Sequence, residues 1–97
     1  MVTWSDHATA QLRHIHNYIA QNSPLYAKRV SSALVQTTIG LDAFPRKGRI
    51  VPELNEENVR ELSLYSYRII YEINRDNIVV LALIHKRMDL QPDDLLR

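Results

Sequence analysis

The stretch Val59–Arg87, VRELSLYSYRIIYEINRDNIVVLALIHKR, has the two-residue periodicity of β-strands. Three strand-like runs in it are separated by the short polar breaks Tyr65-Ser66 and Arg75-Asp76-Asn77. The runs are Val59–Leu64, Tyr67–Asn74 and Ile78–His85. Short breaks favour antiparallel neighbours, so the stretch predicts a three-strand meander. The last run begins IVVLALI, which is apolar throughout, so we expect Ile78–His85 to be the deepest strand, covered on both faces.

The middle run has two unlike faces. Tyr67, Ile69, Tyr71 and Ile73 alternate with Arg68, Ile70, Glu72 and Asn74. Because side chains alternate across a strand, the same register places Glu61, Arg68 and Arg87 away from the main apolar face. We therefore expect the working surface of the protein on that side of the sheet.

The N-terminal half has the 3.6-residue periodicity of helices. A first helix is predicted after the N-cap Ser5, with an apolar stripe at Ala8, Leu12, Ile15 and Ile19. A second helix is predicted to begin at Ser23-Pro24, since serine caps a helix well and proline suits its first position. Its apolar stripe is Ala27, Val30, Leu34, Leu41 and Phe44, with Gly40 as a weak point. The short link between the two predicts an αα-hairpin.

Three short segments complete the predicted fold. Val2-Thr3-Trp4 is suited to an edge strand, Pro52 confines Ile50-Val51-Pro52 to an edge or a strand end, and Pro92 favours one helical turn in the tail. The sequence thus predicts one α+β domain, residues 1–97, with the αα-hairpin packed on one face of a small, mainly antiparallel sheet. We expect the other face of the sheet to be open.

The amino-acid composition argues against a secreted, membrane-bound or metal-binding protein. With 45% apolar and 24% charged residues, the chain has the composition of an ordinary globular domain. Its lack of cysteine fits a reducing cytosol, and no signal peptide or membrane-spanning run is present, so we expect a cytoplasmic protein without a membrane partner. The net charge is only +1, but basic residues cluster at 46–49 and at 86–87. This layout favours binding at one polar or anionic site over non-specific binding along nucleic acid. His14 and His16 have the wrong helical spacing for a shared metal, so neither metal nor cofactor is expected.

An ordered set of short motifs resembles the RelE/ParE superfamily of toxins from type II toxin–antitoxin systems, over nearly the whole chain. The motifs are Tyr18-Ile19, Ser23-Pro24 with Ala27, Pro45 with Gly48-Arg49, Arg60-Glu61-Leu62, Tyr67-Arg68-Ile69-Ile70-Tyr71 and His85-Lys86-Arg87-Met88-Asp89. The final motif is most similar to the ParE branch. That branch implies a toxin that blocks DNA gyrase by binding, with Arg68, Lys86 and Arg87 as target contacts. A small, partly disordered, DNA-binding antitoxin is the implied partner.

The RelE branch implies a different activity, ribosome-dependent cleavage of mRNA. Arg68 and Arg87 correspond to two arginines of that branch, with Glu61 as a possible base and His85 as the only local acid. The chain departs from that branch where Val59 and Glu61 replace a pair of lysines, and it has no tyrosine in residues 90–97. We therefore favour gyrase over the ribosome and binding over catalysis. A third hypothesis is that the protein is a binding module that has lost its toxicity.

Each site residue also has a structural interpretation. Arg68 could form an ion pair with Glu61 or Glu72 inside the sheet, since such networks resemble functional sites. A histidine at the end of an apolar strand, as His85 is, more often serves packing and hydrogen bonding than catalysis. Lys86 and Arg87 could simply be solvated at the end of a strand.

Overall fold

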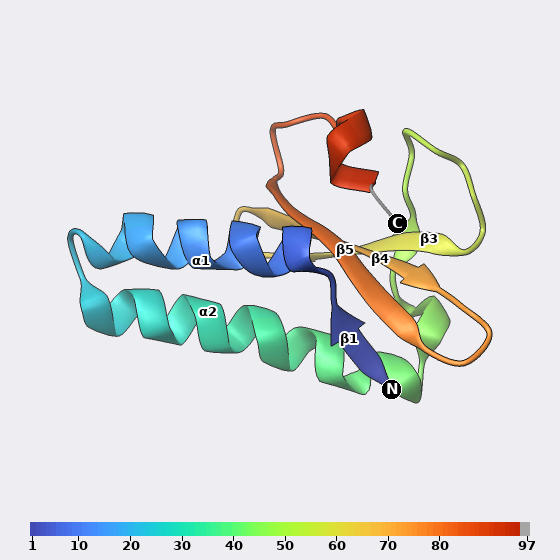
Figure 1. The fold of residues 1–97 in the computed structure, drawn as a ribbon, viewed down its shortest axis with the longest axis horizontal. Coiled ribbons are helices and arrows are strands. Elements are labelled where there is room, and N and C mark those ends of the chain that lie inside the picture. The colour runs from blue at the N-terminus through green and yellow to red at the C-terminus, as the bar shows by residue number, and fades with distance from the viewer. Residues whose placement is uncertain (96–97) are drawn as a thin grey trace.

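The computed structural model describes residues 1–95, which fold as two long helices beside a five-stranded mixed sheet (Figure 1). The helices are α1 (Asp6–Ala20) and α2 (Pro24–Ile39), and they run side by side as the predicted αα-hairpin. The strands are β1 (Val2–Trp4), β2 (Arg49–Ile50), β3 (Val59–Leu64), β4 (Tyr67–Ile73) and β5 (Ile78–His85). Single-turn 3-10 helices span Gly40–Asp42, Pro45–Lys47 and Pro92–Leu95.

The predicted meander is confirmed, and its strands hold the centre of the sheet. The strand order is β1-β5-β4-β3-β2, with β3, β4 and β5 antiparallel to their neighbours in the meander. The edge strand β1 pairs in parallel with β5, from Val2 opposite Ile78 to Trp4 opposite Val80. This pairing makes β5 an interior strand, while β4 is the middle one. The register shifts at Ile70 and Tyr71, where β5 carries Leu81 as an extra residue.

Both helices begin at the predicted caps. The Ser5 hydroxyl accepts a hydrogen bond from the Ala8 amide, and the Ser23 hydroxyl accepts one from the Tyr26 amide, each at 3.1 Å. The predicted stripe of the second helix is wrong at its end. The helix stops at Ile39, where Gly40 is its C-cap, and the 3-10 turn that follows leaves Phe44 71% exposed.

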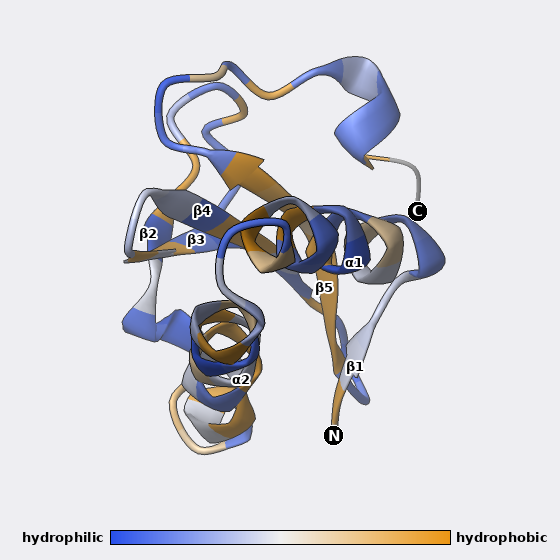
Figure 2. Cartoon of the chain, turned by 90° about the vertical axis from the view of Figure 1, so that its left-hand side faces the viewer, coloured by the Kyte–Doolittle hydropathy of each residue, from blue (hydrophilic) through white to orange (hydrophobic). Residues whose placement is uncertain are grey.

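The main core lies between the helical hairpin and the sheet. Helix residues such as Ala8, Val30 and Leu34 pack there against strand residues such as Ile69 and Leu83. Figure 2 shows β5 as hydrophobic along its length, which matches its burial on both faces. Neither α1 nor α2, nor any shorter helix in the described part of the chain, has the length and apolarity needed to cross a membrane.

The second face of the sheet is not open, and this part of the prediction is wrong. It carries a smaller core of Val51, Val59, Ile70, Ala82 and Ile84. Leu54, from the loop after β2, and Leu90, from the segment after β5, pack against this core. Figure 1 shows these two segments rising on the same side of the sheet. An apolar strand such as β5 has two faces to bury, and the helices cover only one of them.

Candidate functional site

A buried ion pair lies on the second face of the sheet, between β3 and β4. Arg68 donates from Nη2 to Glu61 Oε1 over 2.6 Å and from Nε to the same oxygen over 3.2 Å. The side chains of Glu61 and Arg68 are 1% and 8% exposed. They meet diagonally, because Glu61 stands opposite Ile70 and Arg68 opposite Ser63. The predicted placement of both residues away from the main core is confirmed, and Glu61 is an ion-pair partner of Arg68.

A second carboxylate, Glu53, binds the same guanidinium. Arg68 donates from Nη1 to Glu53 Oε2 over 2.8 Å and from Nη2 to Glu53 Oε1 over 2.7 Å, a bidentate pair. The hydrogen bonds from Arg68 lower the pKa of Glu53 to about 2. In return, the hydrogen bond to Glu53 is the largest cause that raises the pKa of Arg68 above its ordinary value.

The network extends to a second arginine and to the C-terminal segment. Arg49, on β2, donates from Nε to Glu61 Oε2 over 3.0 Å. Arg68 Nη1 also donates to the Met88 carbonyl over 3.2 Å, and the Leu90 amide donates to Glu53 Oε2 over 3.0 Å. Within the described residues, every buried side-chain nitrogen and oxygen has a hydrogen-bond partner. The network therefore holds together the three strands β2, β3 and β4, the loop that carries Glu53, and the segment after β5.

These residues form the floor of an open pocket of about 740 Å³. Its lining residues are Arg49, Pro52, Glu53, Glu61, Ser63, Arg68, Lys86 and Asp89. Three cations thus face three carboxylates. Among the predicted target contacts, the pocket brings Lys86 and Arg68 together, while Arg87 is exposed and does not line it.

His85 lies on the opposite face of the sheet from Arg68. It stands opposite Tyr67, and the two rings pack edge to face with centroids 6.1 Å apart and an interplanar angle of 80°. Tyr67 in turn packs against the main core on the helical side. The His85 Nδ1 atom accepts a hydrogen bond from the Arg87 amide. The structure therefore brings Glu61 and Arg68 together but keeps His85 apart from them.

The comparisons with known proteins identify the family. A family model described as the ParE toxin of the type II toxin–antitoxin system parDE matches residues 2–90. The chain belongs to the ParE toxin family. A solved structure, the chromosomal ParDE toxin–antitoxin system from P. aeruginosa, is similar in fold to this ParE-family chain, with a TM-score of 0.72 at 21% identity. The match covers 87% of this chain and 92% of that one. Among curated proteins, none matches significantly.

The family match confirms the resemblance drawn from the short motifs, the final His-x-Arg-Met-Asp among them. Sequence reasoning placed neither Glu53 nor Arg49 in the network of this ParE-family chain, and it missed the Met88 carbonyl and the Leu90 amide. Glu53 lies in a loop without periodicity, 15 residues from Arg68, and a backbone carbonyl leaves no sign in a sequence. The described residues contain no group of three or more histidine or acidic side chains arranged to hold a metal.

Proposed function

We propose that this chain is a toxin that inhibits DNA gyrase by binding, and that a cognate antitoxin neutralises it. Membership of the ParE toxin family of a type II toxin–antitoxin system supports the toxin role. The observation that favours binding over catalysis is the division of the candidate catalytic groups between the two faces of the sheet.

Cleavage of RNA needs a base, an acid and a cation around one phosphate. Glu61 is a poor base in this position, because one of its carboxylate oxygens is bound by Arg68 and the other by Arg49. The Arg68 guanidinium is likewise occupied by two carboxylates and a carbonyl. His85, the only candidate acid, packs against Tyr67 on the helical side. A transition state at the pocket would have to break the ion pairs first.

A supercoiling assay with purified protein and purified gyrase tests the proposal. We expect inhibition that increases with toxin concentration, and weaker inhibition by Lys86→Ala and Arg87→Ala. Arg75→Ala is the matched control, because Arg75 is an exposed arginine in the turn between β4 and β5. Full supercoiling activity at excess toxin would remove gyrase as the target. Normal growth on expression without an antitoxin would instead support a module that has lost toxicity.

A ribosome-dependent mRNA endonuclease is the second candidate, because Arg49, Arg68 and Lys86 line one open pocket. Primer extension on a translated message after induction separates the two functions. Cuts within the reading frame would support the nuclease, whereas an intact message together with gyrase inhibition supports the first proposal.

For the antitoxin we propose a site between α1 and β5. A hollow of about 450 Å³ lies there, with Ala10, Leu83 and Met88 among its lining residues. Its mainly apolar lining suits the apolar face of an amphipathic helix, which would fold on binding. In co-purification with the antitoxin, Ala10→Arg should abolish the complex, while Gln36→Arg, on the exposed side of α2, should leave it intact. Loss of the complex in both variants would contradict this placement.

A further inference from the structure

Four of the five tyrosines gather on the helical side of the molecule, far apart in the sequence but close in space. Tyr18 comes from α1, Tyr26 from α2, Tyr65 from the turn between β3 and β4, and Tyr67 from the start of β4. Together with His85 they line a hollow of about 420 Å³. We call these five residues the tyrosine surface. It lies on the other side of the sheet from the ion-pair network.

Three of the four tyrosine rings are open to solvent, and Tyr67 is half-buried. Tyr18 is 68% exposed, Tyr26 47% and Tyr65 44%. Within residues 1–95, none of the four hydroxyls makes a hydrogen bond, whereas the fifth tyrosine, Tyr71, donates to the Pro45 carbonyl and accepts from the Gly48 amide. Single exposed aromatic residues are ordinary, but several that converge on one hollow indicate a binding surface.

The backbone at Tyr65 holds this residue in an unfavourable conformation. Its φ angle of 54° lies in the left-handed region, which glycine or asparagine occupies more readily than a bulky aromatic residue. Residues with backbone strain of this kind cluster at binding and active sites. The turn therefore keeps a tyrosine at the rim of the hollow where a glycine would be easier to accommodate.

The Tyr67 hydroxyl lies within electrostatic reach of two others in the tyrosine surface. Burial is the largest cause that raises the pKa of Tyr67, and the neighbouring Tyr26 and Tyr18 raise it further. The raised pKa of Tyr67 favours its neutral phenol, which can stack without bringing a negative charge to the surface.

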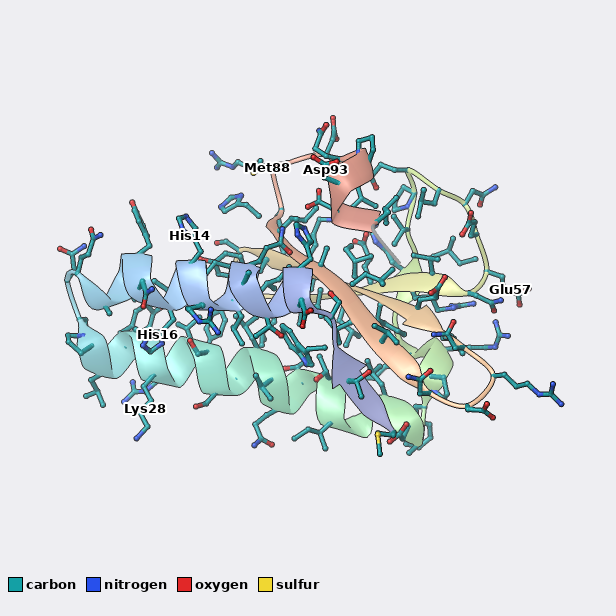
Figure 3. The ribbon with its side chains drawn as sticks, in the orientation of Figure 1. His14, His16, Lys28, Glu57, Met88 and Asp93 are labelled. Carbon is teal, nitrogen blue, oxygen red and sulfur yellow. The ribbon has the colours of Figure 1, made fainter. Side chains whose placement is uncertain are left out.

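The helical hairpin beside the tyrosine surface carries almost no negative charge. Residues 7–41, which include both helices except Asp6, contain no aspartate or glutamate. Arg29 lies one helical turn after Tyr26, and Arg87 is bonded through its amide to His85. Figure 3 shows His14 on the outer side of α1 and Lys28 on the outer side of α2, which adds a cation to the flank of the hairpin. An anion approaching the tyrosine surface meets no carboxylate from the hairpin.

We propose that the tyrosine surface binds single-stranded nucleic acid, with bases stacked on the tyrosine rings and phosphates near Arg29 and Arg87. Stacking on aromatic rings beside a cationic rim is the general mode of binding for such strands. An acidic peptide fits less well, because the centre of the surface is aromatic and the cations lie at its margin. The inference is independent of the proposed inhibition of gyrase, since it concerns a binding event that can be measured with the toxin alone.

The test is fluorescence anisotropy of a labelled oligothymidine titrated with the full chain at low salt. We expect saturable binding that weakens as salt rises, because phosphate contacts release counterions. An abasic oligonucleotide of the same length keeps the phosphates and loses the bases, so it should bind about tenfold more weakly. Tyr18→Ala and Tyr26→Ala should each weaken oligothymidine binding by about tenfold, and Tyr18→Phe should restore most of it.

Phe44→Ala is the matched control, because Phe44 is also a highly exposed aromatic residue but lies after the far end of α2. It should bind oligothymidine like the parent chain, and circular dichroism should show that all variants are folded. Equal binding of the abasic strand would overturn the proposal, since it would leave only charge attraction. Absence of binding at low salt, or displacement of oligothymidine by polyglutamate at equal charge, would overturn it as well.

Discussion

Arg68 and Glu61 form an ion pair across neighbouring strands, 2.6 Å from Nη2 to Oε1, with both side chains almost wholly shielded from water. Such a pair is costly to break from one side only, because the remaining charge stays buried without its partner. The same two side chains also bind Glu53, Arg49 and the Met88 carbonyl. The stability of the second face therefore depends on this pair. If an Arg68 variant loses toxicity, its stability must also be measured, because unfolding alone could explain the loss.

Removal of the Arg68 side chain should destabilise the fold. We expect Arg68→Ala to lower the free energy of unfolding by about 3–5 kcal/mol, because the buried Glu61 keeps only the exposed Arg49 as a partner and Glu53 loses its bidentate pair. Urea denaturation measures the change. Arg46→Ala is the control, since the ion pair of Arg46 with Glu57 is exposed on both sides and is worth less than about 1 kcal/mol. An Arg68→Ala chain of unchanged stability that no longer inhibits its target would assign Arg68 to target contact.

The free energy of unfolding should depend on pH through the carboxylate of Glu53. Because Arg68 depresses the pKa of Glu53 to about 2 in the folded chain, this carboxylate stabilises the fold above its unfolded pKa. The contribution is lost as the pH falls through the folded pKa. The stability difference between the parent chain and Glu53→Gln should thus be constant near neutral pH and shrink from about pH 4.5 toward pH 2. A difference that does not change over this window would show that Glu53 is not paired in solution.

The two glycines should respond oppositely to alanine. A Cβ atom at Gly48 would lie 2.5 Å from the Glu61 carbonyl oxygen and 2.7 Å from the Tyr71 hydroxyl, so the backbone of β3 must shift. We expect Gly48→Ala to cost roughly 3 kcal/mol. Gly40→Ala meets nothing within 4 Å and should be neutral or slightly stabilising. Thermal denaturation compares the two, and similar melting temperatures would contradict this packing.

The C-terminal segment should be released by a change at Asp94. Its Oδ1 atom accepts from His7 Nε2 at 3.0 Å and from Gln11 Nε2 at 3.1 Å, which ties the last 3-10 turn to α1. We expect Asp94→Ala to speed tryptic cleavage after Lys86 and Arg87 several-fold. The neighbouring Asp93 is exposed, so Asp93→Ala should be cleaved at the parental rate. Equal rates for the two variants would show that the contact with α1 does not hold the segment.

The sequence predicted the elements with clear periodicity. The meander, both helix caps and the edge strand at Val2–Trp4 followed from local patterns, and the α+β class followed from their order. The parallel partner of that edge strand did not, because 76 residues separate Val2 from Ile78 and nothing local records their pairing. The covered second face was also missed. Leu54 and Leu90 cover this face, and both are single leucines in irregular segments. Without a periodic pattern around them, they look like leucines in an exposed loop.

The candidate site was predictable only in part. Alternation along β3 and β4 placed Glu61 and Arg68 on one face, since both lie in regular strands. His85 was grouped with them because it directly precedes Lys86 and Arg87. The alternation of side chains along β5, however, puts His85 on the same face as Tyr67, which packs on the helical side. The tyrosine surface had one visible signal, the absence of acidic residues from 7 to 41. Its five members span four elements and a turn, so only the folded chain brings them together.

The place of β5 between β1 and β4 also bears on how the sheet is completed. Val2 of β1 and Ile78 of β5 are far apart in the sequence, so their parallel pairing closes a long loop and is slow to form. Until β1 docks, one edge of β5 has no strand beside it, and an unpaired strand edge readily accepts a strand from another chain. A partner that is present during folding can therefore meet an edge of β5 that the finished sheet conceals.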